Sequence, residues 1–307
     1  MVRGTIAITD YDWYRRLLSE PVDEVNFWKP SSTRAFYAEE FSPFIFKLRA
    51  PHNAICGFGF FARYSRLPDW LAWETFGVGN GCASLEEMRI RIHGIRQRIR
   101  FRGLAPSEIG CILIVNPVFF PPERWVAPPK DWPPRTQAEK KYDIRDGEGA
   151  RVWADCLASV AIPTADKAQR PPAFQRYGEP VLVVPRLGQG TFRIGVTDAY
   201  ARGCAVTGEH SLPALDAAHI RPYRMDGPHE IANGLLLRAD LHRLFDKGYI
   251  TIRPNLRIEV SERLREDFDN GHSYYPWHGR EISCPANRRE WPEETYLQWH
   301  NENVYLG

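Results

Sequence analysis

The segment from Cys204 to Thr251 gathers residue types that can hydrolyse a phosphodiester. His219 lies in the apolar stretch LDAAHIRPY, and His242 precedes Asp246 by four residues in LHRLFD. A neutral imidazole titrates near physiological pH and can take a proton from water. Imidazole and carboxylate ligands can hold a divalent cation, which neutralises charge on the phosphate and on its departing oxygen. The pattern therefore predicts attack by an activated water, with His219 as the base.

Four elements are expected to position these side chains in this order: a strand, a loop, a second strand and a short helix. Asn233 stands at the loop-to-strand turn and is expected to fix the loop that carries His219. His242 and Asp246 lie one helical turn apart and project to the same side, where they can hold a metal. Asp216, three residues before His219, offers another carboxylate. Alternation along a regular strand places it on the other face from His219, so a bulge or bend would be needed for Asp216 to serve as a ligand.

The same segment resembles the HNH family of the ββα-metal nuclease fold. It shares the features of a subgroup with an A-H-I-x-P first histidine, an N-G-L-x-L centre and an L-H-x-x-F-D-x-G ending. The resemblance covers about residues 186–307. It implies that His219 activates the water, Asn233 orients this base and His242 binds one divalent metal ion, Mg²⁺ or Mn²⁺.

The second protein ligand of that metal is left open by the sequence. Many HNH proteins carry an Asp directly before the first His, where this chain has Ala218. Asp216 is the nearest replacement and Asp246 the other candidate, although Asp246 also suits a helix end ahead of Gly248. Many relatives also hold a structural zinc through two C-x-x-C pairs. The six cysteines here are scattered without such a pair, so we expect no structural zinc and no disulfide scaffold.

Seven further histidines are expected to be structural or exposed. If mutation showed that another histidine takes part in the chemistry, His229 and His278 would be the next candidates. The others are His52, His93, His210, His272 and His300.

The N-terminal part is expected to form a small β-barrel with helices. β-prone runs bounded by turn residues occur at 44–48, 54–61 and 109–115. After the second run, Ser84 and Glu87 make a capping-box signature ahead of apolar residues at helical spacing. The other face of this helix carries arginines, with no acid between residues 88 and 102. A solvated surface would explain them, but guanidinium groups suit phosphate oxygens. We therefore predict DNA phosphate binding by Arg89, Arg91, Arg96 and Arg98.

About residues 20–156 resemble the EVE-like members of the PUA superfamily. The resemblance rests on NFWKPS at 26–31, FKLRAPHNAICGFGFFARY at 46–64 and LAWETFGVGNGCAS at 71–84. It implies a small barrel that reads nucleic acid and can accept a flipped, modified base in an aromatic cage. Such a pocket needs flat apolar faces and a polar group for the base edge. Core packing is the commoner role of a buried aromatic, but we predict the pocket from Asn26, Phe27, Trp28, Tyr64 and Trp73.

Length and composition favour two domains of an α+β protein. The chain has 307 residues, of which 43% are hydrophobic, and this is long for a single core. Proline and polar residues break the pattern between about Ser159 and Arg186. We expect a PUA/EVE-like reader at 1–160, a linker at 161–185 and a ββα-metal HNH nuclease at 186–307. No apolar run is long enough to span a membrane and the start lacks a signal-peptide layout, so a cytoplasmic protein is expected.

These features together predict a modification-dependent DNA endonuclease that restricts foreign double-stranded DNA carrying altered bases. One HNH site cuts one strand, so a homodimer is expected for double-strand cleavage. Two alternatives stay open. A nonspecific HNH nuclease acting as a defence effector or toxin would share the catalytic residues, and a nucleic-acid reader with an inert nuclease module would share only the binding surfaces.

Overall fold

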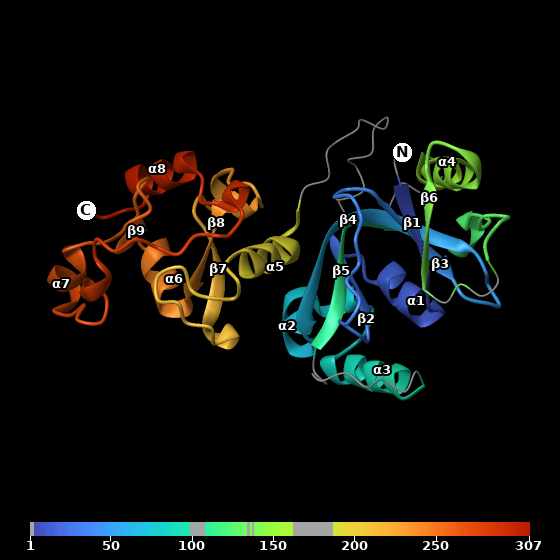
Figure 1. The fold of residues 1–307 in the computed structure, drawn as a ribbon, viewed down its shortest axis with the longest axis horizontal. Coiled ribbons are helices and arrows are strands. Elements are labelled where there is room, and N and C mark those ends of the chain that lie inside the picture. The colour runs from blue at the N-terminus through green and yellow to red at the C-terminus, as the bar shows by residue number, and fades with distance from the viewer. Residues whose placement is uncertain (1–2, 99–107, 134–135, 137, 162–186) are drawn as a thin grey trace, which may run out of the picture. The chain divides into compact units, whose positions relative to one another are not determined.

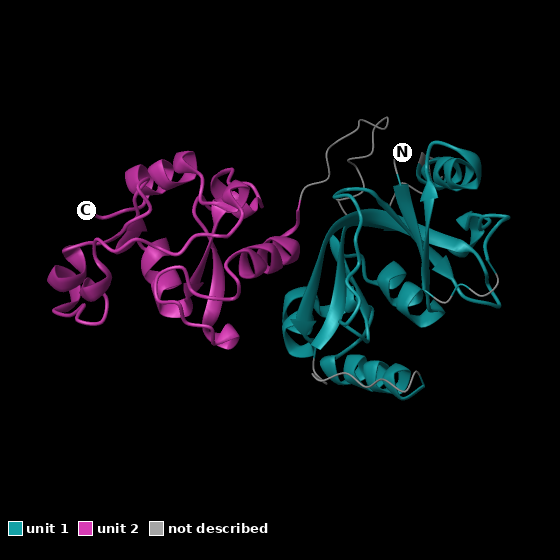
Figure 2. Ribbon diagram, in the orientation of Figure 1, with its two compact units in different colours: residues 1–186 teal, residues 187–307 magenta. Residues whose placement is uncertain are grey.

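The computed structural model describes residues 3–98, 108–133, 136, 138–161 and 187–307. The chain divides into two compact units, Met1–Arg186 and Leu187–Gly307 (Figure 2). Of the expected linker at 161–185, only Ala161 lies within the described residues, as the last residue of a helix. Each unit is described by itself below.

Unit 1 is built on a six-stranded sheet with the order β2-β5-β4-β3-β1-β6 (Figure 1). Neighbouring strands are antiparallel except for the parallel pair β1 and β3. The predicted strands at 44–48, 54–61 and 109–115 are confirmed, and the last two extend well beyond the predicted ends. The strands are β1 (Arg3–Thr9), β2 (Glu24–Lys29), β3 (Pro43–Leu48), β4 (Ile55–Pro68), β5 (Glu108–Phe119) and β6 (Glu139–Asp143).

The two edge strands of this sheet are joined by side chains. Lys29 at the end of β2 forms an ion pair with Glu139 at the start of β6, with 2.8 Å between Nζ and Oε1. The sheet must therefore curl for its first and last strands to meet. No backbone ladder between β2 and β6 occurs in the described residues, so the predicted barrel is an open, barrel-like sheet.

Both faces of the sheet are covered because its strands are apolar on both sides. On β3, Phe44 and Phe46 pack with Trp13 of helix α1 (Tyr11–Ser19). Ile45, which points the other way by strand alternation, packs with Val152 of helix α4 (Gly147–Ala161). A strand buried on both faces reads as a continuous apolar run, which is how PFIFKL appears in the sequence.

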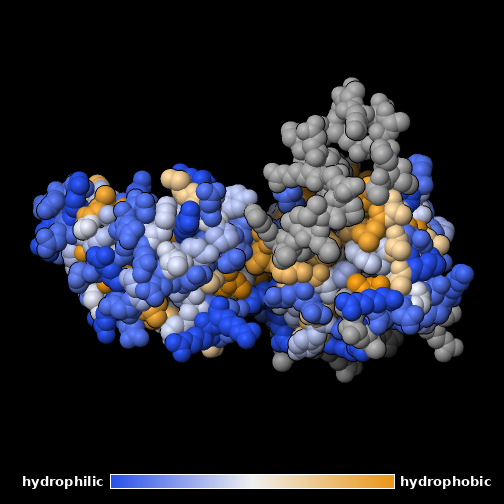
Figure 3. Space-filling view, turned by 90° about the horizontal axis from the view of Figure 1, so that it is seen from above, coloured by the Kyte–Doolittle hydropathy of each residue, from blue (hydrophilic) through white to orange (hydrophobic). Residues whose placement is uncertain are grey.

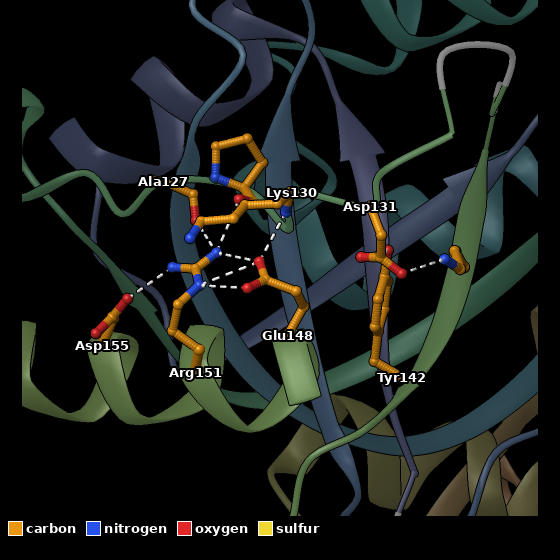
Figure 4. Close-up of polar contacts among 9 residues, drawn as sticks. Ala127, Lys130, Asp131, Tyr142, Glu148, Arg151 and Asp155 are labelled. Atoms are coloured by element: carbon orange, nitrogen blue, oxygen red, sulfur yellow. Dashed lines mark hydrogen bonds and ion pairs between the residues drawn. The ribbon is translucent and has the colours of Figure 1, made fainter. Parts of the chain in front are cut away.

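Helix α4 is held against the proline-rich segment that follows β5. The Arg151 guanidinium binds Glu148 and Asp155 on its own helix and donates to the carbonyls of Ala127 and Pro128 (Figure 4). The backbone N–H of Lys130 donates to Glu148 at 2.7 Å. These bonds satisfy loop carbonyls and explain how a segment without regular structure is ordered.

Helix α2 (Asp69–Phe76), the short helix η1 (Gly77–Asn80) and helix α3 (Leu85–Arg98) follow β4. The Ser84 half of the predicted capping box of α3 is confirmed, whereas the return bond of Glu87 goes to the residue before the cap. The N–H of Glu87 donates to Oγ of Ser84 at 3.1 Å, and the Glu87 carboxylate accepts from the N–H of Ala83. Met88 and Ile92 are the buried residues of this helix.

Unit 2 has the predicted order of strand, loop, strand and helix. Strands β7 (Leu215–His219) and β8 (Gly234–Arg238) form an antiparallel pair, and helix α6 (Ala239–Asp246) follows. Helix α5 (Gln189–Ala199) precedes them and contributes to the same hydrophobic core. The remaining elements are η4 (Leu212–Ala214), η5 (Tyr223–Met225), η6 (Ile231–Asn233), β9 (Ile250–Ile252), β10 (Ile258–Val260), α7 (Arg263–Phe268), η7 (Tyr275–Trp277), η8 (Arg288–Glu290) and α8 (Glu294–Asn303).

The surface of unit 2 is mostly hydrophilic on the face shown in Figure 3, with small separate hydrophobic spots. In the described part of the chain, no helix has both the length and the apolar character that crossing a membrane requires.

Candidate active site

His219 ends strand β7 and is enclosed by other aromatic rings. The ring of Phe192, from α5, stacks on it with 3.8 Å between centroids and 15° between planes. Nε2 of His219 is hydrogen-bonded to Nδ1 of His229 at 2.9 Å. Burial, with smaller contributions from the charges of His229 and His242, lowers the pKa of His219 to about 4. The imidazole is therefore neutral at physiological pH, as a base must be.

Asn233 is fully buried and fixes the loop after His219. Its Oδ1 accepts from the N–H of Arg221, and its Nδ2 donates to the carbonyls of Arg221 and Pro228, each at 2.9 Å. Its own carbonyl accepts from the N–H of Ile220. The side chain thus closes the loop over residues 221–228 by backbone contacts alone, which matches the loop-fixing role predicted from its position.

Gly234 explains why a glycine follows Asn233. A Cβ at this position would lie 2.3 Å from Cγ2 of Val196 and 3.1 Å from Cε2 of Phe192, both on α5. The missing side chain lets α5 approach the start of β8 and brings Phe192 onto His219. The Asn-Gly pair therefore positions the base from two directions, through the loop and through the helix.

His242, on α6, meets Asp216 from the neighbouring strand. Nδ1 of His242 lies 3.3 Å from Oδ2 of Asp216. Strands β7 and β8 pair without a register shift, so no bulge turns Asp216 to the face of His219. In a regular strand Asp216 shares a face with Ala218, two residues on. The HNH resemblance implies a ligand Asp at the position of Ala218, and Asp216 contacts His242 without a bulge.

Asp246 contacts the opposite nitrogen of the same ring, with 3.4 Å between its Oδ2 and Nε2 of His242. The two carboxylates therefore flank His242 rather than surround one point with it. A histidine binds a metal through one nitrogen, and its second nitrogen commonly bonds a carboxylate. No group of three histidine, cysteine or carboxylate side chains in the described residues is arranged around a single ion. The donor types fit a divalent cation held by His242 and one aspartate, with the other positions open to water or phosphate.

The sequence analysis did not single out Phe192 or Tyr223 and named His229 only as a next candidate, yet all three contact the site. Tyr223, whose side chain is 63% exposed, stacks on His229 with 4.5 Å between ring centroids. Phe192 lies outside the motif, and His229 lies in a polar loop without periodicity. In the sequence, nothing beyond the residue type marked Phe192 or His229 as part of the site.

His300 is a structural histidine, as predicted. It is 2% exposed, and its Nε2 bonds the carbonyl of Phe245 at 3.0 Å while its Nδ1 bonds Oγ1 of Thr251 at 2.8 Å. Burial lowers the pKa of His300 to about 4. The residue ties helix α8 to α6 and β9.

The five predicted pocket residues of unit 1 are divided between the two faces of the sheet. Asn26 pairs with Leu113 and Tyr64 with Ile112, so alternation on β5 puts these two on opposite sides. Phe27 and Tyr64 pack beside the core residues around Trp13. Trp73, on α2, is half-buried. The structure therefore does not bring all five into one pocket.

Asn26 and Trp28 do lie together, against η1. Nδ2 of Asn26 donates to Oδ1 of Asn80 at 2.8 Å and to Sγ of Cys111 at 3.3 Å, and Trp28 donates to the carbonyl of Asn80. Asn26 is fully buried, and its Oδ1 has no hydrogen-bond partner among the described residues. A base could reach this amide only if η1 moved.

Three of the four predicted phosphate-binding arginines have partners within unit 1. Arg89 binds Asp69 through two nitrogens, at 2.8 and 3.1 Å, and Arg91 binds Glu87 at 2.6 Å. Arg96 donates to the carbonyls of Pro30 and Glu108. Arg98 is exposed at the end of α3. The acidic partners Asp69 and Glu87 lie outside residues 88–102, so the composition of that stretch did not reveal these ion pairs.

Comparisons with known proteins match the segment that holds His219, Asn233 and His242. Residues 204–253 match the model of the HNH endonuclease family. No curated protein matches the chain significantly.

Two solved structures give weak matches. The ASCH protein from Zymomonas mobilis has a TM-score of 0.34 and 10% identity, over 49% of this chain and 94% of that protein. The modification-dependent restriction endonuclease TagI has a TM-score of 0.27 and 13% identity, over 92% and 75%. TM-scores this low do not establish a common fold. It is therefore residues 204–253, spanning β7, β8 and α6, that are similar to HNH endonucleases.

Proposed function

We propose that this protein is a DNA endonuclease in which His219 activates the attacking water. The observation that carries the proposal is the environment of His219: neutral, stacked on Phe192 and held by a loop that Asn233 closes. His242 and Asp216 contact each other within the segment similar to HNH endonucleases, and the charge of His242 contributes to the lowered pKa of His219. A lone structural histidine would not bring this set of groups together.

The chemistry follows from these positions. His219 takes a proton from water, and the water oxygen forms a bond to phosphorus. The bond from phosphorus to the 3′ oxygen breaks and this oxygen takes a proton from solvent, which leaves 5′-phosphate and 3′-hydroxyl ends. A divalent cation would neutralise charge on the phosphate and the departing oxygen. Aromatic packing around His219 keeps the ring in one orientation during this transfer.

His242 and Asp216 are the proposed ligands of that cation, and Asp246 is proposed to orient the His242 ring. Asp216 contacts Nδ1 of His242, so these two residues would hold the cation through that nitrogen and the Asp216 carboxylate. Asp246 then takes the place of the carboxylate that commonly bonds the second nitrogen of a metal-binding histidine.

Modified double-stranded DNA is the proposed substrate. This part of the proposal rests on the resemblance of residues 20–156 to EVE-like domains and on the separation of the chain into two units. Asn26, with its unpartnered Oδ1, and the neighbouring Trp28 are the proposed contacts to the base. One nuclease site cuts one strand, so two copies are proposed to act together for a double-strand break.

Digestion of matched DNAs tests the proposal. The substrates are unmodified, methylated, hydroxymethylated and phosphorothioated versions of one sequence, each incubated with Mg²⁺ or Mn²⁺. We expect cleavage of at least one modified DNA in preference to the unmodified DNA, and loss of cleavage in His219→Ala. Equal cutting of all four would favour a nonspecific nuclease. Unchanged cutting by His219→Ala would refute the proposed mechanism, and no cutting with either metal would favour an inert reader.

A further inference from the structure

The hydrogen bond between His219 and His229 contains one proton, and its position decides whether His219 can act as a base. The bond joins Nε2 of His219 to Nδ1 of His229 at 2.9 Å. Each neutral imidazole has one N–H donor and one lone pair. Therefore one ring donates and the other accepts.

The two arrangements differ in the lone pair that remains on His219. If His229 donates, Nε2 of His219 uses its lone pair in the bond and the proton of His219 sits on Nδ1. The ring then has no lone pair for water. If His219 donates from Nε2, its Nδ1 keeps the lone pair. This nitrogen has no hydrogen-bond partner among the described residues, so it is available to water.

We propose that His229 is a positioning residue that accepts the Nε2 proton of His219 and keeps the base in its competent tautomer. The inference rests on the proposed function in that His219 is the base. It assigns to His229 a task that the HNH resemblance gave to Asn233. The side chain of Asn233 bonds the backbone of Arg221 and Pro228, not the imidazole of His219.

His229 is itself held in place by contacts on both sides. Tyr223 stacks on its ring with 6° between planes, and Phe192 lies 5.8 Å from it between centroids. Asn233 bonds the carbonyl of Pro228, the residue before it. The rings of Phe192, His219, His229 and Tyr223 thus form one connected aromatic cluster from the core of unit 2 to its surface.

A histidine partner differs from a backbone carbonyl, which can only accept. Because His229 can also donate, the competent arrangement requires its proton to be on Nε2. A variant that keeps an acceptor and a variant that has none separate positioning from packing. Asparagine offers an acceptor oxygen, whereas lysine has donors only.

The experiment compares His229→Asn and His229→Lys in the full chain, with the exposed His272→Leu as a control. We expect His229→Asn to keep kcat within about 10-fold of wild type. We expect His229→Lys to lower kcat by about 100-fold, the lower end of what a positioned general base contributes. KM is expected to change little in His229→Asn. Wild-type kcat in His229→Lys, or equal losses in both variants, would overturn the proposal.

Nitrogen-15 NMR of the histidine rings measures the tautomer without any cleavage assay. In wild type at neutral pH we expect His219 to show the Nε2–H pattern, and in His229→Lys the Nδ1–H pattern. His300 is an internal reference, because its Nε2 bonds a carbonyl and must carry the proton. An Nδ1–H pattern for wild-type His219 would overturn the proposal even if every variant failed to fold.

The two experiments keep this inference apart from the proposed function. If His219→Ala cleaves DNA like wild type, the proposed function fails, while the wild-type spectrum still reports the tautomer. If His219→Ala is inactive and the two His229 variants behave alike, the positioning role alone fails.

Discussion

Replacing Asn233 is expected to destabilise unit 2 far more than its small size suggests. Asn233→Ala removes one acceptor and two donors from a fully buried position. At about 1 kcal/mol net for each hydrogen bond, the loss is about 3 kcal/mol in the free energy of unfolding. For a unit spanning Leu187–Gly307, this corresponds to a midpoint roughly 10 °C lower.

Asn233→Asp gives the sharper test because aspartate has nearly the same shape. The ionised carboxylate can still accept from the N–H of Arg221, but it cannot donate to the carbonyls of Arg221 and Pro228. It instead faces them with negative charge in a buried site. We expect Asn233→Asp to be at least as unstable as Asn233→Ala at pH 7.

Thermal and urea unfolding of the full chain measure both variants, and cleavage assays follow kcat. Asn255→Ala is the control: it loses one exposed hydrogen bond, from the N–H of Arg257, and is expected to change stability by no more than about 1 kcal/mol. A wild-type midpoint for Asn233→Asp would refute the reasoning, since shape alone would then account for the residue. The reasoning would also be refuted if Asn233→Ala lowered the free energy of unfolding by less than about 1 kcal/mol.

Three further outcomes follow from the site. Burial lowers the pKa of His300 to about 4, and an unfolded histidine titrates near 6.5, so the unfolded chain binds more protons between these values. Stability of unit 2 should therefore fall as the pH drops from about 6.5 to about 4. Burial lowers the pKa of His219 to about 4 as well, so His300→Gln should reduce this pH dependence in urea unfolding without removing it. An unchanged slope would contradict the assignment to His300. EDTA should abolish cleavage, and added Mn²⁺ or Mg²⁺ should restore it. Asp216→Ala should raise the metal concentration needed for half-maximal rate more than Asp246→Ala does. The reverse order would assign the ligand to Asp246. Gly234→Ala should cost about 1–3 kcal/mol by pushing α5 from β8, and a crystal structure with Phe192 still on His219 would contradict the predicted displacement.

The sequence predicted local features of the fold well because they depend on neighbouring residues. The Ser84 and Glu87 cap, the apolar run that became β3 and the order of β7, β8 and α6 all followed from patterns within a few residues. The ends of β4 and β5 were missed because long-range pairing extends them past their apolar runs.

Features that depend on contacts between distant segments could not be predicted in this way. The parallel pairing of β1 with β3 and the Lys29 to Glu139 bridge join residues far apart in the chain. In the site, the residue types and their spacing were enough to identify His219 and His242. The bulge thought necessary for Asp216 is not needed, because this carboxylate contacts His242 from a strand that pairs without a register shift. The partner of His219 lay in a loop where no periodic pattern exists.

Because Phe192 stacks on His219, a nuclease segment that is moved into another protein must begin before Phe192. The family similarity starts at residue 204, but α5 lies before that point and supplies both the ring above His219 and the side chains that Gly234 admits. A fusion protein cut at residue 204 would carry every motif residue and still leave one face of His219 open to solvent. Protein engineers who graft this module onto another binding domain should therefore join the chains before Gln189, the first residue of α5.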